Sequence, residues 1–127
     1  MTTHVLHATG LRNVSEALQE LHKQLLRFQA EQAGFFGSPL ELFERATKDQ
    51  SFAWLKPLRE EIVALDERRA DEEPISDAET KAYCDRFRNL LDVQTGPFRE
   101  KINVAFQSDP ETIWAVGSVR KTLDALS

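Results

Sequence analysis

Residues 51–67, SFAWLKPLREEIVALDE, decide how the fold is interpreted, because they place a proline inside a helical pattern. The apolar residues of this stretch recur three or four positions apart, as in a helix with one buried face: Phe52, Leu55, Leu58, Ile62 and Leu65. A helix that began at Pro57 would have Lys56, a poor capping residue, as its N-cap, and a break would normally reset the apolar spacing. We therefore predict one helix over residues 51–70 that Pro57 kinks rather than starts, leaving the carbonyl of Ala53 without its N–H partner.

The same spacing predicts a long helix in the N-terminal part of the chain. Its apolar stripe consists of Val14, Leu18, Leu21, Leu25 and Phe28. Gly34 and Gly37 follow the stripe, and glycine readily adopts the left-handed conformation with which helices end. Residues 1–9 precede the stripe, and we expect them to be frayed.

Capping motifs indicate where further helices begin. These motifs are SPLE at residues 38–41, SDAE at 76–79 and SDPE at 108–111. The short helix that follows the first motif is expected to turn Leu40 and Phe43 inward, with Leu42 as a further candidate. The final helix is expected to be lined by Ile113, Val116, Val119, Leu123 and Leu126.

The succession of helices predicts the fold class and the number of domains. No segment shows sustained alternation of apolar and polar residues, so no sheet is expected. A length of 127 residues suits a single domain, residues 1–127. The expected fold is all-α: an antiparallel helical bundle of about four main helices plus one or two short ones.

The composition favours a bacterial cytoplasmic protein with no nucleic-acid or membrane partner. The net charge is −5, whereas binding to nucleic-acid phosphates depends mainly on lysine and arginine. Cys84 is the single cysteine, so no internal disulfide is possible. No run approaches the ~18 apolar residues of a membrane-spanning helix, and the N-terminus lacks the basic and apolar regions of a secretory signal.

Residue types that carry chemistry are present, but not at the spacing that the chemistry requires. His4, His7 and His22 form neither of the histidine–glutamate patterns of metal-binding helices. Cys84 lies on the core-facing stripe of its helix, where a buried thiol keeps a raised pKa and is unreactive. The carboxylates of residues 60–73 are expected on a solvated face. We therefore predict no catalytic, cofactor-binding or metal-binding residues.

The aromatic residues give the best functional hint. Phe35 and Phe36 lie between two glycines, and Trp54 and Trp114 each lie beside an apolar stripe. Large apolar residues are normally buried, so one interpretation is that these residues close the ends of the bundle. The alternative is an exposed patch of Phe35, Phe36 and Trp54 that binds a partner, because Trp and Phe are enriched at the centres of interfaces.

The segment FAWLKPLREEIVALDE, with the preceding GSPLELFERATKD, resembles a block in a family of small bacterial all-helical proteins of uncharacterised function. In that block an aromatic-Ala-Trp-Leu-basic-Pro-Leu segment leads into an Ile-Val-x-hydrophobic-Asp-Glu helix. The resemblance covers residues 37–67, and Arg59 and Glu60 stand where small or apolar residues are expected. It implies a helical fold and brings no activity and no catalytic residues to this chain.

Two functional hypotheses follow. The first is a non-enzymatic interaction or regulatory module that binds a protein partner, or a second copy of itself, near Phe35, Phe36 and Trp54. The alternative is a small-ligand-binding bundle or an enzyme, with a pocket opened by the bend at Pro57 and a free backbone carbonyl at Ala53. Sequence-specific DNA binding ranks below both, because the chain is acidic.

Overall fold

The computed structural model describes residues 2–126, with side chains from residue 8 onward. Its helices are α1 (Thr2–Gln32), α2 (Pro39–Lys48), the 3₁₀-helix η1 (Gln50–Leu55), α3 (Lys56–Ala70), α4 (Asp77–Asp92), α5 (Pro97–Ser108) and α6 (Pro110–Asp124). No strand occurs in this part of the chain, so the predicted all-α class is confirmed. The segment 1–9, for which the sequence predicts a frayed end, is helical from Thr2. Within residues 2–126, no helix combines the length and apolar character needed to cross a lipid bilayer.

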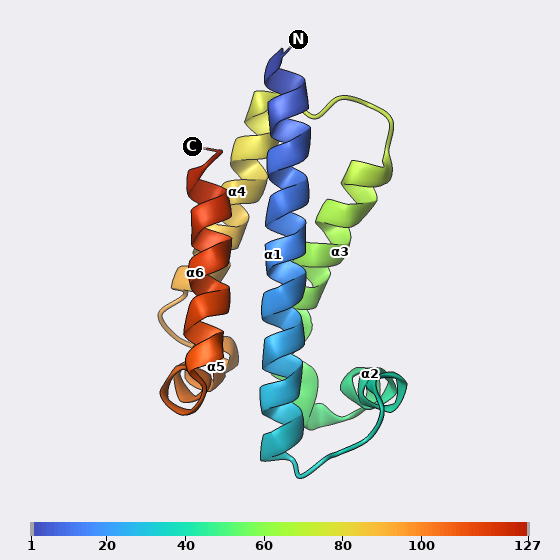
Figure 1. The fold of residues 1–127 in the computed structure, drawn as a ribbon, viewed down its shortest axis with the longest axis vertical. Helices are drawn as coiled ribbons and strands as arrows, with labels where there is room; N and C mark the ends of the chain where they lie inside the picture. The colour runs from blue at the N-terminus through green and yellow to red at the C-terminus, as the bar shows by residue number, and fades with distance from the viewer. Residues whose placement is uncertain (1, 127) are drawn as a thin grey trace.

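The long axis of the molecule is followed by α1, α3, α4 and α6, and the chain reverses direction from each of them to the next (Figure 1). α1 lies in the middle of this view, with α3 on one side, α6 on the other and α4 behind. The shorter α2 and α5 lie crosswise at the end of the bundle where α1 finishes. α1 contacts every other helix, and α6 most extensively. These contacts agree with the predicted antiparallel bundle.

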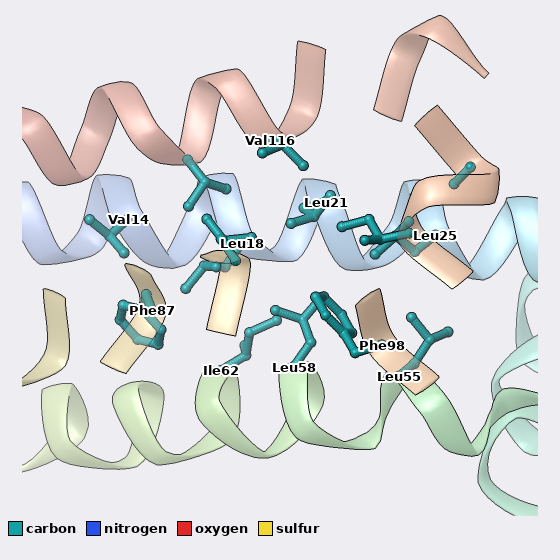
Figure 2. Packing of buried hydrophobic residues seen from close by; sticks show 14 of the residues in the cluster. Val14, Leu18, Leu21, Leu25, Leu55, Leu58, Ile62, Phe87, Phe98 and Val116 are labelled. Atoms are coloured by element: carbon teal, nitrogen blue, oxygen red, sulfur yellow. The ribbon is translucent and has the colours of Figure 1, made fainter. Parts of the chain in front are cut away.

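The core is built around one face of α1. The residues of this face are at most 1% exposed: Leu11, Val14, Leu18, Leu21 and Leu25. Figure 2 shows Leu18, Leu21 and Leu25 in the layer between α6 and α3. Leu58 and Ile62 of α3 point toward this layer, as does Phe98 of α5. The predicted apolar stripe of α1 is therefore confirmed, and it reaches all the long helices.

Pro57 starts a helix instead of kinking one, so the prediction of a single α-helix over residues 51–70 is wrong. Residues up to Leu55 form η1, and α3 begins at Lys56 with Pro57 in its first turn. There the missing N–H of proline removes no intrahelical hydrogen bond. The apolar spacing persists because the backbone stays helical across the junction, with φ −85° and ψ −11° at Leu55. The carbonyl of Ala53 is not free, because it accepts the N–H of Lys56.

The predicted capping motifs act as caps. The hydroxyl of Ser38 accepts the N–H of Glu41 over 3.2 Å, and that of Ser76 accepts the N–H of Glu79 over 3.1 Å. Asp109 accepts from the first turn of α6 in the same way. Gly34, just beyond α1, has a φ of 70°, which explains why glycine ends this helix.

The inward-facing stripe predicted for α2 is wrong at Leu40 and Phe43. The stripe predicted for α6 is confirmed at Val116, Val119 and Leu123 and wrong at Ile113. Leu40 and Phe43 of α2 are 68% and 60% exposed, whereas α2 rests on the bundle through Leu42 and Ala46. In α6, Ile113 is exposed and Thr112 is buried instead. Burial of Thr112 is tolerated because its hydroxyl lies within hydrogen-bonding distance of the cap Asp109.

Candidate functional site

Trp54 lies in the core and not in an exposed patch. Its side chain is 6% exposed, and its indole N–H donates to Oε1 of Gln29 over 2.8 Å. The centre of its ring lies 6.0 Å from that of Phe98. Trp54 thus joins η1 to α1 and α5. The structure does not bring Phe35, Phe36 and Trp54 together on the surface, because Trp54 is covered.

Exposed apolar side chains gather instead on α2 and on the loop before it. Phe36 is 87% exposed, and Leu40 and Phe43 lie three residues apart on the solvent side of α2. Phe35 is half-buried, with the guanidinium of Arg45 4.8 Å from its ring centre. Phe35, Phe36 and Phe43 help to line an open groove of about 500 Å³ between α1 and α2. We refer to Phe36, Leu40 and Phe43 as the α2 surface.

Charged residues of both signs border the α2 surface. From α1, Lys23 and Arg27 line the groove together with Glu31. From α2, Glu41 and Glu44 are exposed to solvent. An apolar centre with a charged border is the arrangement found in many protein–protein interfaces.

A second hollow, which we call the His22 cavity, lies where α1, α2, η1 and α3 meet. Its volume is about 210 Å³. The apolar part of its wall consists of Leu26, Phe43, Ala46, Phe52, Ala53 and Leu55. Its ionisable residues are His22, Lys48, Asp49, Lys56 and Arg59. The cavity lies beside the Pro57 junction, where the alternative hypothesis expects a pocket, but the packing of α2 against α1 and η1 encloses it rather than a bend.

His22 of α1 is one of the residues that line this cavity. It is half-buried in the wall of the cavity. Burial lowers the pKa of His22 below its ordinary value of 6.5, and the nearby Arg59 guanidinium lowers this pKa further. His22 is therefore held in its neutral form. No local spacing indicates this position, because the residues that line the cavity with His22 come mainly from α2, η1 and α3.

Asp49 is the one carboxylate in the wall of the His22 cavity, and it has partners of its own. Its Oδ1 accepts the backbone N–H of Ser51 over 2.9 Å, and its Oδ2 lies 3.3 Å from Nε of Arg45. The hydrogen bonds from Ser51, followed by that from Arg45, lower the pKa of the Asp49 carboxyl. This carboxylate is therefore charged and occupied as the cap of η1.

The other candidate residues whose side chains are described are not gathered into a site. Cys84 is 4% exposed, and burial raises the pKa of its thiol, in line with the expectation from its core-facing position. Among the residues that the structure describes, no three His, Cys, Asp or Glu side chains are grouped so that they could hold a metal ion. The side chains of His4 and His7 lie outside the described residues. Trp114 is 78% exposed, beside a shallow groove between α1 and α6.

No family model, curated protein or solved structure with which the chain was compared matches it. The α2 surface and the His22 cavity are the features of the described residues that indicate a function.

Proposed function

We propose that this chain is a protein-binding module that associates with a second copy of itself through the α2 surface. The observation that carries this proposal is the exposure of Leu40 and Phe43 on a helix that has no buried residue. Burying one Phe or Leu side chain contributes about 1.5–3 kcal/mol. An interface that covered Phe36, Leu40 and Phe43 would gain several such contributions.

The weak attachment of α2 also favours a partner. α2 is 10 residues long, and isolated helices shorter than ~12 residues are marginal in water. Leu42 and Ala46 are its half-buried contacts with the core of its own chain. A partner on the opposite side would complete the burial of its apolar residues and so stabilise the helix.

The charges around the α2 surface favour a second copy as the partner. A two-fold symmetric interface brings one surface against itself, so that surface must be self-complementary. Here Lys23 and Arg27 lie on the α1 side, and Glu41 and Glu44 lie on α2. Two copies related by such a two-fold axis can place the cations of one against the carboxylates of the other. Charge pairs of this kind speed up association and fix the relative orientation of the partners more than they raise affinity.

Light scattering over a range of concentrations tests the proposal. The wild-type mass is expected to rise from 14.5 kDa toward twice that value as the concentration increases. Leu40→Glu places a charge in the apolar centre and is expected to give a monomer with an unchanged circular dichroism spectrum. Trp114→Ser removes an equally exposed aromatic residue from α6 and is the matched control. A wild-type monomer at every concentration contradicts self-association, and loss of the dimer in the Trp114 variant alone contradicts the choice of surface.

A further inference from the structure

We infer that the His22 cavity binds a small organic carboxylate, with the carboxylate group between Arg59 and His22 and an apolar group against Phe43 and Phe52. All four residues line this cavity. The inference goes beyond self-association, since it concerns a small molecule in a second hollow that adjoins the α2 groove. Phe43 is the aromatic residue shared by the His22 cavity and the α2 groove.

The wall of the cavity is positive in a chain that is negative overall. Lys48, Lys56 and Arg59 line it against the single carboxylate of Asp49, although the net charge of the chain is −5. Asp49 is occupied by hydrogen bonds from its own neighbours. The ammonium of Lys56 lies 3.8 Å from the carboxylate of Glu60. The local excess of cations therefore attracts an anion.

Arg59 is a half-buried cation in this wall that is available to a ligand. Among the side chains described, from residue 8 onward, no hydrogen bond or ion pair to its guanidinium is found. Its nitrogen atoms are not among the buried polar atoms that lack a partner, so the guanidinium remains in contact with solvent. The paired N–H groups of a guanidinium match the two oxygens of a carboxylate, so Arg59 can bind and orient a carboxylate ligand without breaking an internal ion pair.

His22 makes the affinity for such a ligand depend on pH. The charged groups that line the cavity with His22 are Lys48 and Asp49 at the end of α2, and Lys56 and Arg59 of α3. Burial and Arg59 hold the pKa of His22 below 6.5 while the cavity is free of an anion. A bound carboxylate stabilises the imidazolium, so binding takes up a proton. Affinity should therefore rise as the pH falls, for as long as the ligand itself stays ionised.

The volume and the apolar wall limit the rest of the ligand. A cavity of about 210 Å³ has room for about seven molecules of liquid water, at ~30 Å³ each. This is below the size of most drug-binding pockets and suits an acid with one ring or one branched chain. The rings of Phe43 and Phe52, with Leu26 and Leu55, offer such a group an apolar surface. An inorganic anion would leave this surface uncovered.

Calorimetric titration with benzoate, at about pH 5.5 and about pH 7.5, tests the inference on the full chain. Benzoate is expected to bind, and to bind several-fold more tightly at the lower pH. Arg59→Gln should weaken the affinity about tenfold or more, as expected from the loss of a charge-assisted hydrogen bond. His22→Gln should retain binding and lose most of its pH dependence. Arg12→Gln, at an exposed position of α1 outside the cavity, is the matched control and should bind as the wild type does.

Two further ligands test separately what the negative charge and the apolar group contribute to affinity. Benzyl alcohol has nearly the shape of benzoate without its charge, and inorganic phosphate has charge without an apolar group. Both are expected to bind more weakly than benzoate. Benzyl alcohol as tight as benzoate would overturn the role of the carboxylate, and phosphate as tight as benzoate would overturn the role of the apolar wall. An absence of benzoate binding, or equal affinities in the Arg59 and Arg12 variants, would overturn the site itself.

Discussion

A buried hydrogen bond between Gln29 and Trp54 holds the tryptophan in the core, although the residues next to Trp54 in the sequence do not show whether it is buried or exposed. Gln29 is 5% exposed, and its amide oxygen accepts the indole N–H of Trp54. Buried tryptophans usually find such an acceptor. The two residues lie on different helices, so the spacing within either helix carries no information about their contact. This is why the sequence left Trp54 open to a core and a surface interpretation.

Removal of the acceptor at residue 29 should destabilise the fold. Gln29→Met keeps a long side chain but leaves the buried N–H of Trp54 without a partner, which costs about 1–3 kcal/mol of unfolding free energy. Urea denaturation followed by circular dichroism measures this loss. Gln32→Met, at an exposed position near the end of the same helix, is the control and should change stability by less than about 0.5 kcal/mol. Equal effects of the two substitutions would show that the Trp54 contact is not stabilising.

His22 should make the fold less stable in mild acid. Its pKa is lowered in the folded state by burial and by Arg59, whereas the unfolded chain keeps a value near 6.5. The unfolded chain therefore binds more protons between these two pKa values. Stability that is fully present above pH 6.5 is lost as the pH falls toward the folded-state pKa. His22→Gln should reduce the loss of urea resistance between about pH 7 and about pH 5.5, and an unchanged loss would rule out His22 as its source.

At the scale of elements, a substitution of Pro57 tests whether this proline lies in the first turn of α3 or interrupts a longer helix. Because Pro57 lies in that turn, Pro57→Ala restores no missing hydrogen bond. The substitution should lower stability by about 0.4–1 kcal/mol, since alanine gives the unfolded chain more freedom. A proline that interrupted a helix would behave in the opposite way, and its removal would gain up to ~3 kcal/mol. Thermal unfolding distinguishes the two signs. Pro110→Ala, at the start of α6, is the matched control and should behave like Pro57→Ala.

The elements also show which features local sequence predicts. The cap at Ser38 and the stripe of α1 depend on residues within one or two turns, and both were predicted correctly. The face of α2 was predicted wrongly, because Leu40, Leu42 and Phe43 are all apolar and the packing of α2 against η1 and α1 decides which of them is covered. The continuous apolar spacing through Pro57 was real, but a 3₁₀-helix followed by an α-helix preserves that spacing as well as one α-helix does.

At the scale of the whole molecule, the two candidate surfaces follow from how the crosswise α2 meets the bundle. α2 lies crosswise at the end of the bundle where α1 finishes (Figure 1). Its residues Phe43, Ala46 and Lys48 line the His22 cavity, and its Leu40 is exposed to solvent. Arg59 and His22 belong to different long helices and meet only because α3 packs against α1. The all-α class could be predicted because it follows from the apolar periodicity within single helices. The His22 cavity could not be predicted in this way, because it is formed by the packing of four elements against one another.

Association through α2 should appear in the thermal stability of the whole molecule. If two copies bind in the folded state, mass action makes Tm rise with protein concentration. Leu18→Ala removes a side chain that is 1% exposed in the core and should cost about 2–5 kcal/mol, lowering Tm at every concentration. Leu40→Ala removes a 68% exposed side chain and should leave Tm in dilute solution nearly unchanged while making Tm rise less with concentration.

Calorimetric scans over a hundredfold range of concentration would separate the effects of these two substitutions. A wild-type Tm that does not change over that range would contradict self-association through the α2 surface.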